Sequence, residues 1–307
     1  MTPCDKCSRP SVIFVRYSGA HLCSHHFCEF VEKRVRHELR RQLALGRNDK
    51  IAVAVSGGKD STVALHLINQ ILGHRKDTQI SAVTVDEGIA GYREPSLPII
   101  AENCRALGVE HIIVSFKDLY GSTMDEIANS SRELTACSYC GVLRRAAMNR
   151  AAREWGATYI ATGLNLDDTA QSILMNFARG DTERLARLGP HKRIQPGLVR
   201  RIQPLRSIPE NETTLYALLK KIEYHNLECP YAPEALRNDY RSVLFQLEDK
   251  YPGTRHSLMR SYDEILPALE NLFPPAELKT CTCGEPTISK RCKACELMDS
   301  LKGPSRT

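Results

Sequence analysis

The sequence predicts an α/β protein with a doubly wound parallel sheet and a small metal-binding module at each end. Two observations predict this fold class. Between residues 51 and 180, short apolar runs typical of buried strands alternate with amphipathic stretches of helical length. Near both termini, cysteines gather in stretches too short to form a hydrophobic core of their own, which is typical of modules that fold around a metal ion.

The alternating pattern defines the elements in order. Strands are expected at 51–55, 80–86, 111–116 and 158–163. Helices are expected at 29–46, 61–72, 96–108, 141–156, 166–180, 210–226 and within 240–272, the first of them strongly basic. Ligands of such sheets bind outside the carboxyl ends of the strands, and Ser56, Asp86 and Gly163 follow three of these strands.

Composition divides the chain into three parts. We expect an N-terminal zinc ribbon at 1–30, the α/β domain at 31–272, and a C-terminal part at 273–307 that starts with the proline-rich linker "FPPAE" and continues with a zinc module and a polar tail. No apolar run reaches the roughly 18 residues of a membrane helix, and no signal peptide is recognisable, so a cytoplasmic protein without a membrane partner is expected. In a reducing compartment, twelve cysteines favour metal or catalytic sites over disulfides.

The stretch "VSGGKDS" at 55–61 joins a predicted strand to a predicted helix. Gly57 and Gly58 permit a tight turn whose backbone N–H groups can approach an anion, and the helix that starts near Ser61 favours negative charge at its N-terminus. The stretch is neither a Walker A motif nor a G-x-G-x-x-G loop. It resembles the PP-loop, SGGxDS, of ATP pyrophosphatases, which implies that it holds the pyrophosphate part of ATP. Asp60 and Asp86 offer hard oxygen ligands for Mg²⁺.

The cysteine pairs at the two ends are typical of structural zinc sites. Cys₃His and Cys₄ are common closed zinc sets, and the C-x-C spacing of the last pair gives a strained chelate loop. The expected ligands are Cys4, Cys7, Cys23 and His26 at one end, with His25 and Cys28 as alternatives for the fourth position, and Cys281, Cys283, Cys292 and Cys295 at the other.

The middle pair, Cys137 and Cys140, lies just before the helix expected to start near Gly141. Its plausible third partner is Cys229, about ninety residues away. Three thiolates without a fourth ligand are a poor structural zinc site but suit an iron–sulfur cluster with one exposed iron. A thioredoxin-type redox pair is the rival interpretation.

Taken together, these motifs resemble one family. The matching stretches are "CDKC…LCSHHF", "AVSGGKDST", "TACSYCGVLRR", "TGLNLDDTAQSILMN", "IQPLRSIPENETTLYA", "ECPYA" and "CKAC", which span nearly the whole chain. In this order they resemble the TtuA-type tRNA 2-thiouridine synthetases, the group that includes the cytosolic tRNA thiolation subunit of archaea and eukaryotes. The chain departs from that family at Cys281-Thr-Cys283, where a C-x-x-C pair is usual.

The resemblance implies a Rossmann-like PP-loop domain and a tRNA-thiolating sulfurtransferase. ATP would adenylate O2 of a tRNA uridine, and sulfur would then attack C2 and expel AMP. A [4Fe–4S] cluster on Cys137, Cys140 and Cys229 would carry sulfide on its open iron. The sulfur would come from a thiocarboxylated ubiquitin-like carrier or from inorganic sulfide, and the protein would be a homodimer. Wobble and T-loop uridines are both compatible targets, and three cysteines fit a [4Fe–4S] or a [3Fe–4S] state.

The same resemblance assigns roles to single residues. Asp168 matches the catalytic aspartate of the family, with Asp167 as its runner-up, and Arg144, one helical turn beyond Cys140, is expected to face the ATP phosphates. The expected catalytic residues are Asp168, Arg144, Asp60, Cys137, Cys140 and Cys229. The expected ligands of ATP and Mg²⁺ are Ala54, Ser56, Gly57, Gly58, Lys59, Asp60, Ser61, Asp86, Arg144, Gly163 and Asp168.

Two other functions fit parts of the sequence. Lysidine-type ligases and 2-thiocytidine synthetases also modify tRNA with a PP-loop, but the first needs no cluster cysteines and the second lacks paired zinc modules. A non-catalytic RNA-binding zinc-ribbon protein would bind tRNA without turnover, and its binding would not depend on Asp60 or Asp168.

Overall fold

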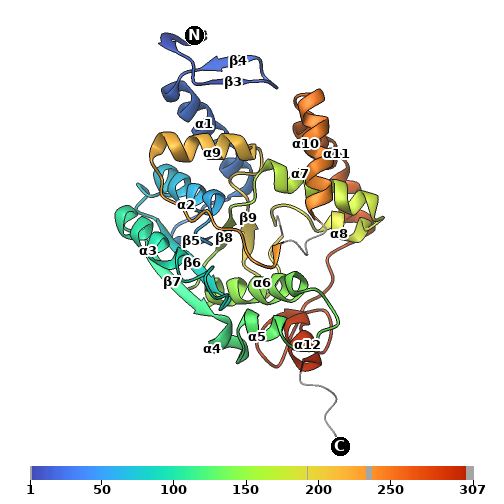
Figure 1. Ribbon diagram of the computed structural model, residues 1–307. Coiled ribbons are helices and arrows are strands. Elements are labelled where there is room, and N and C mark those ends of the chain that lie inside the picture. Colours follow the sequence, from blue (N-terminus) through green and yellow to red (C-terminus); the bar gives the residue numbers. More distant parts are fainter. Residues whose placement is uncertain (1, 192, 233–236, 302–307) are drawn as a thin grey trace, which may run out of the picture.

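The computed structural model describes residues 2–191, 193–232 and 237–301, with the side chains of 237 and 238 left aside (Figure 1). At its centre is a parallel sheet in the order β7-β6-β5-β8-β9. The strands are β5 (Asp49–Ala54), β6 (Thr78–Asp86), β7 (Glu110–Ser115), β8 (Tyr159–Thr162) and β9 (Arg200–Ile202). The chain runs outward from β5 to β7 and then returns to the other side of β5. Doubly wound sheets bind their ligands at the point of this reversal.

Helices cover both faces of the sheet. One face carries α2 (Lys59–Leu72), with α1 (Ser24–Gln42), α3 (Ser96–Leu107) and α9 (Glu210–Lys220) packed around it. The opposite face carries α6 (Ala136–Glu154), flanked by α4 (Phe116–Tyr120) and α5 (Met124–Ala128). A further group, beside α6 in Figure 1, consists of α7 (Leu166–Ala178), α8 (Thr182–Ala186), α10 (Arg237–Lys250) and α11 (Thr254–Leu272).

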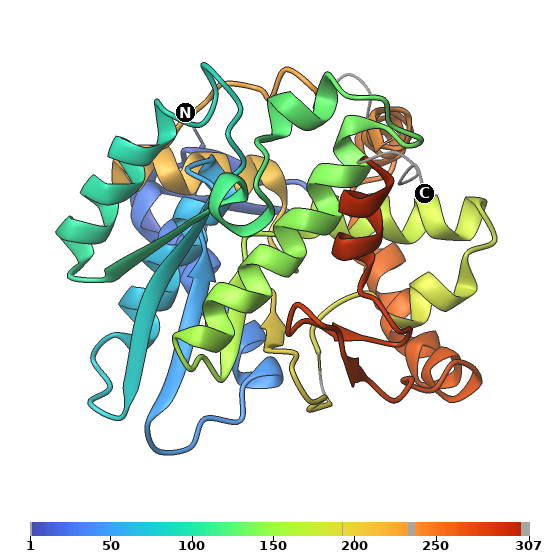
Figure 2. The same ribbon diagram turned by 90° about the horizontal axis from the view of Figure 1, so that it is seen from below.

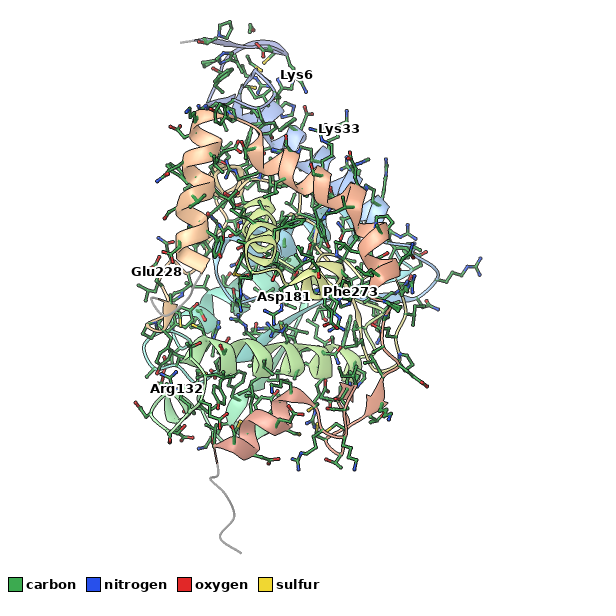
Figure 3. All side chains as sticks on the ribbon, turned by 90° about the vertical axis from the view of Figure 1, so that its right-hand side faces the viewer. Lys6, Lys33, Arg132, Asp181, Glu228 and Phe273 are labelled. Atoms are coloured by element: carbon green, nitrogen blue, oxygen red, sulfur yellow. The ribbon has the colours of Figure 1, made fainter. Side chains whose placement is uncertain are left out.

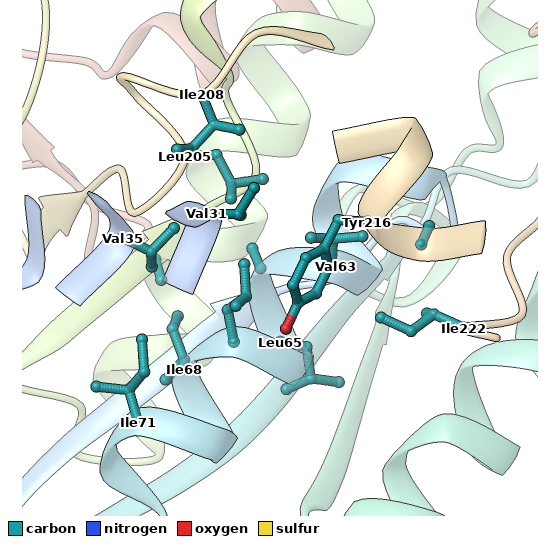
Figure 4. Packing of buried hydrophobic residues seen from close by; sticks show 14 of the residues in the cluster. Val31, Val35, Val63, Leu65, Ile68, Ile71, Leu205, Ile208, Tyr216 and Ile222 are labelled. Atoms are coloured by element: carbon teal, nitrogen blue, oxygen red, sulfur yellow. The ribbon is translucent and has the colours of Figure 1, made fainter. Parts of the chain in front are cut away.

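The largest hydrophobic core lies on the α2 face. Figure 4 shows Val31 and Val35 of α1 packed with Val63 of α2 and Tyr216 of α9. These side chains are almost completely buried, whereas the opposite side of α1 carries exposed bases such as Lys33 (Figure 3). The basic stretch therefore forms an amphipathic helix whose apolar side holds it on the domain.

Each expected strand and helix overlaps an element of the structure, so the α/β class is confirmed. The short edge strand β9 was not expected, because "RRI" is charged and carries no apolar run. The stretch 240–272 forms two helices, since Gly253 adopts φ 98° between them. Helix α9 ends at Lys220 rather than at 226.

Helix α6 starts earlier than the sequence indicated. Thr135 is its N-cap and accepts a hydrogen bond from the backbone N–H of Ser138, so the helix begins at Ala136. The expectation that Cys137 and Cys140 precede the helix is therefore wrong. Both cysteines lie in the first turns of α6, one helical turn apart on the same side.

The N-terminal module consists of two antiparallel hairpins. They are formed by β1 (Pro3–Cys4) with β2 (Cys7–Pro10), and by β3 (Ile13–Val15) with β4 (Ala20–Leu22). Tyr17, in the second hairpin, donates to Glu212 Oε1 of α9 at 2.6 Å, and Arg34 of α1 donates to Glu212 Oε2 at 2.8 Å. The expected boundary at residue 30 falls inside α1, which runs continuously from the module into the domain.

The C-terminal module consists of a hairpin, β10 (Lys279–Thr280) with β11 (Pro286–Thr287), and helix α12 (Lys293–Ser300). Helix α12 packs on α6 (Figure 2). The last six residues of the expected tail, 302–307, lie outside the described residues. None of the described helices combines the length and the apolar character needed to cross a membrane.

Candidate active site

The PP-loop lies between β5 and α2. Gly57 adopts φ +83°, and a Cβ atom there would lie 2.9 Å from Cβ of Ser96, so both backbone angle and space require glycine. The Ser61 hydroxyl accepts from the backbone N–H of Ser56 at 3.1 Å and donates to the carbonyl of Gly58 at 2.9 Å. These bonds fix the loop while the first N–H groups of α2 remain directed at an incoming anion.

A cavity of about 420 Å³ opens beside this loop. Of the residues expected to bind ATP, eight line it: Ala54, Ser56, Gly58, Lys59, Asp60, Ser61, Arg144 and Gly163. Gly57, Asp86 and Asp168 are not among its lining residues. Glu87, Arg93, Arg145 and Arg201 line it as well, and none of them was among the residues expected to bind ATP.

Gly163 allows the end of β8 to pass very close to α2. A Cβ atom at this position would lie 2.6 Å from the Ser61 nitrogen and 2.8 Å from the Asp60 carbonyl carbon. Gly163 is an expected ATP ligand, and the structure gives a packing reason for glycine here, because any side chain would push away the first turn of α2.

Substitution Gly163→Ala is expected to lower ATP affinity about tenfold and stability by about 1–3 kcal/mol, because overpacking displaces the turn that holds the phosphates. Isothermal titration with ATP and a thermal melt measure both. Gly46→Ala is the matched control, since a Cβ atom there would meet only Asp49 Oδ2, at 3.8 Å. Wild-type affinity and melting temperature in Gly163→Ala would show that α2 tolerates the displacement.

A buried ion pair supports the loop from below. Glu87 and Arg93 are 1% and 2% exposed, and the Arg93 guanidinium donates to Glu87 Oε2 at 2.6 and 2.8 Å. The same guanidinium donates to the Ser56 carbonyl at 2.6 Å. Glu87 Oε1 lies 3.6 Å from Nη1 of Arg144, whose side chain is 47% exposed at the cavity. The Glu87 carboxylate thus contacts both Arg93, which holds the PP-loop, and Arg144 on α6.

Asp60 and Lys59 both turn toward α9. Asp60 Oδ1 accepts from the Thr213 hydroxyl at 2.6 Å, and burial raises the pKa of this carboxyl against the opposing charge of Lys59. The Lys59 ammonium donates to Thr214 Oγ1 at 2.9 Å and lies 3.4 Å from Glu210 Oε1. Both side chains line the cavity, so an arriving Mg²⁺–phosphate group would compete with α9 for them.

Asp168 occupies the start of α7 in a capping box. Its backbone N–H donates to Asn165 Oδ1 at 3.0 Å, and its carboxylate accepts from the Asn165 N–H at 3.3 Å. The runner-up Asp167 faces another way, with an ion pair to Arg255 and a 2.8 Å bond from the backbone N–H of Glu210. Asp86 accepts from the backbone N–H of Gly88 at 2.8 Å, within its own loop.

The three middle cysteines belong to segments that meet beside this cavity. Cys137 Sγ donates to the carbonyl of Tyr231 at 3.2 Å, two residues beyond Cys229. Burial raises the pKa of the Cys140 thiol to about 11. The charge of Arg144 acts in the opposite direction, and the neighbouring Cys229 and Cys137 raise the pKa further. In the described part of the chain, these cysteines are not among the groups whose ligand atoms all lie within 4.8 Å of one another. A multi-iron cluster suits a wider spacing than a single ion, because each cysteine binds a different iron.

At the N-terminal end, Cys4, Cys7, Cys23 and His26 place their ligand atoms within 4.8 Å of one another. His26 Nδ1 lies 3.3 Å from Cys4 Sγ and 3.5 Å from Cys23 Sγ. The alternatives for the fourth ligand point elsewhere, because His25 pairs with Glu29 at 3.2 Å and Cys28 is buried in the core beneath α1.

The C-terminal set is equally close, with Cys281, Cys283, Cys292 and Cys295 within 4.8 Å. A turn closed by Gly284, at φ 88°, accommodates the C-x-C pair. Backbone N–H groups of Cys283 and Cys292 lower the pKa of the Cys281 thiol to about 6, and a thiolate is the form that binds zinc.

Family comparison agrees with this geometry. A model described as a PP-loop domain matches residues 30–248, and one described as the N-terminal LIM domain of 2-thiouridine synthetase TtuA matches residues 4–28. The tRNA 2-thiolation protein NcsA of Haloferax volcanii is 39% identical over 97% of this chain and 99% of its own length. The tRNA-5-methyluridine(54) 2-sulfurtransferase of Pyrococcus horikoshii is 35% identical over 95% of this chain and 92% of its own.

A solved structure is also similar over nearly the whole chain. The U34-tRNA thiolase NcsA from Methanococcus maripaludis, solved with its [4Fe-4S] cluster, has a TM-score of 0.85 and 35% sequence identity. The match covers 98% of this chain and 97% of that one. Since the fold, the family models and full-length relatives agree, the chain belongs to the PP-loop family of tRNA 2-thiolation proteins.

Proposed function

We propose that this protein is a tRNA uridine 2-sulfurtransferase that activates the C2 carbonyl with ATP and replaces its oxygen with sulfur. One observation carries the proposal. Helix α6 begins with Cys137 and Cys140, and one turn later it contributes Arg144 to the cavity beside the PP-loop. An ATP-activating site and a three-cysteine site therefore adjoin, as a two-step replacement of oxygen by sulfur requires.

In the first step, O2 of the uridine attacks the α-phosphorus of ATP and the bond to pyrophosphate breaks. Negative charge grows on the departing pyrophosphate, which the N–H groups at the start of α2 stabilise. Arg144 supplies a cation at the cavity, and Glu87 fixes its position. Asp60 is the proposed Mg²⁺ ligand, and Asp168 the proposed acidic group at the start of α7. In the second step, sulfide adds at C2, the C2–O bond breaks, and AMP leaves with the original oxygen.

The residues around the middle cysteines fit a cluster. The charges of Cys137 and Cys229 act on Cys140, and Cys137 Sγ donates to the carbonyl of Tyr231 in the segment that carries Cys229. Cys137, Cys140 and Cys229 would hold a [4Fe–4S] cluster, which when bound supplies one iron free of protein ligands as a coordination position for sulfur. Cys140 must lose its proton to bind iron, and the nearby Arg144 charge favours the thiolate.

The remaining assignments complete the proposal. The terminal sets would hold structural zinc in modules at about 1–30 and 273–307, around a catalytic domain at 31–272. The sulfur donor would be a thiocarboxylated ubiquitin-like carrier or inorganic sulfide, and the protein would act as a cytoplasmic homodimer. A reducing cytoplasm keeps all these cysteines available as thiolate ligands.

The test is anaerobic reaction of the reconstituted protein with unmodified tRNA, ATP and sulfide, followed by nucleoside mass spectrometry. We expect 2-thiouridine, with one AMP and one pyrophosphate per thiolated base. Arg144→Ala should lower turnover about 10²–10³-fold, the usual loss of a charge-stabilising group, and leave tRNA affinity within about twofold. Release of AMP without any thiolated base would exclude the sulfurtransferase. Digestion with mapping distinguishes the wobble from the T-loop uridine.

A further inference from the structure

A second cavity adjoins the ATP-binding one. It has a volume of about 310 Å³ and lies between residues of 186–191 and 193–198 on one side and of 273–278 on the other, next to Phe273 at the end of α11 (Figure 3). Arg201 of β9 lines both cavities. Arg201 therefore lies between the nucleotide site and the second cavity.

The charge of Arg201 is not balanced by any carboxylate that the structure describes within ion-pair distance. Its Nη2 donates to His191 Nε2 at 2.9 Å, and its buried Nε finds no hydrogen-bond partner among the described residues. Burial, and then the Arg201 charge, lower the pKa of His191 to about 4, so this histidine is a neutral acceptor. The charge of Arg145 also acts on Arg201. Arg201 is only partly buried, and a guanidinium that faces no carboxylate and lies near a second cation is a suitable partner for an anion.

The residues that line the second cavity indicate which kind of ligand carries that anion. Arg193 is exposed at its rim, and Arg187, which also lines the cavity, is paired with Glu183. Glu270 is the one carboxylate among the described lining residues, and much of the remaining wall is apolar, with Phe273 and Leu198. A phosphate would satisfy the arginines, and an apolar wall with an aromatic ring suits a ribose and a base.

We propose that Arg201 binds the phosphodiester next to the target uridine and that the second cavity holds the adjoining nucleotide of the tRNA. This inference rests on the proposed function. A uridine that enters the ATP cavity remains joined to its neighbours through phosphates, so an anion must sit at the passage where the strand leaves. Arg201 borders both cavities, and Arg193 is placed to meet the strand further out.

The experiment measures binding of an unmodified tRNA transcript to the full-length, cluster-loaded protein over a series of salt concentrations. Arg201→Gln and Arg193→Gln are each expected to raise the tRNA Kd about tenfold and to reduce the log–log salt slope by about one. The ATP affinity of Arg193→Gln should stay within about twofold, because Arg193 lines only the second cavity. The matched control Arg179→Gln, an exposed arginine at the end of α7 outside both cavities, should bind like wild type.

Three results would overturn the inference. If both variants bind tRNA like wild type, neither arginine contacts a phosphate of the tRNA. A loss of ATP affinity in Arg201→Gln assigns that residue to the nucleotide, and a selective loss of sulfur-carrier binding assigns the cavity to a peptide carboxylate. Arg193 is exposed, so its variant tests the cavity even if the Arg201 variant misfolds. If wild-type protein binds no tRNA, the proposed function fails with the inference, whereas unchanged variants of a binding wild type refute the inference alone.

Discussion

Cys229→Ala is expected to abolish iron–sulfur loading and to lower thiolation at least about 100-fold. Removal of a residue that only supports a metal ligand already lowers metal affinity or activity about 10–100-fold. Cys229→Ala removes a proposed ligand itself, so a larger loss is expected. The segment that carries Cys229 contacts α6 through the bond from Cys137 Sγ to the Tyr231 carbonyl. Iron content and the visible absorption spectrum after anaerobic reconstitution measure the loading, and nucleoside mass spectrometry measures the activity.

Cys104→Ala is the matched control for this experiment. Cys104 is a buried thiol on α3 whose pKa burial raises to about 11, like that of Cys140, but it lies in the core on the other face of the sheet. Its variant should retain wild-type iron content. An unchanged cluster spectrum in Cys229→Ala would remove Cys229 from the ligand set. A Cys137–Cys140 disulfide formed during turnover would instead support the redox-pair interpretation.

Glu87→Gln is expected to lower the free energy of unfolding by about 3–5 kcal/mol, the usual cost of breaking a buried ion pair and leaving its partner charged. The variant leaves the Arg93 guanidinium buried without a counter-ion beneath the PP-loop. It also releases Arg144 from its fixed position. We therefore expect a raised KM for ATP together with a lowered kcat, measured on protein that is still folded at the assay temperature.

The surface pair Glu102–Arg105 provides the comparison. Glu102 is half exposed on α3 and pairs with an arginine one turn away, so Glu102→Gln should change stability by less than about 1 kcal/mol. Urea unfolding of both variants separates the two cases. If Glu87→Gln is as stable as Glu102→Gln, the buried pair contributes no more than a surface pair, and its role as a support for the loop is refuted.

The parts of the site that were predictable are those encoded locally. Gly57, Gly58 and Ser61 form a loop whose geometry depends on neighbouring residues, and the spacing of the terminal cysteines fixes their clusters. Asn165-x-x-Asp168 is also a local signal for a capping box, and it shows that the Asp168 carboxylate has a structural partner in addition to its proposed catalytic role.

The residues that escaped prediction act over longer distances. Glu87 directly follows the second strand, beside the candidate Asp86. Its role becomes apparent only in the structure, where Arg93 lies beneath the loop and donates to the Glu87 carboxylate. Strand β9 has no apolar pattern by which it could be recognised in the sequence. The sequence therefore did not show that the side chain of Arg201 lies between the sheet and α6. Cys229 was chosen as the partner of Cys137 and Cys140 from the cysteines present and then supported by family resemblance, since no local rule brings residues so far apart in sequence together.

The packing of the C-terminal module on α6 has a consequence for how the protein matures. Tyr139 and Leu143 of α6 share a hydrophobic cluster with Cys281 and Cys292, and the Tyr139 hydroxyl meets Ser300 Oγ at 3.2 Å. The helix that presents Cys137 and Cys140 is thus seated on a module whose own folding would depend on zinc. Loss of zinc from this module would therefore loosen one of the surfaces that hold α6, and iron–sulfur loading would weaken with it.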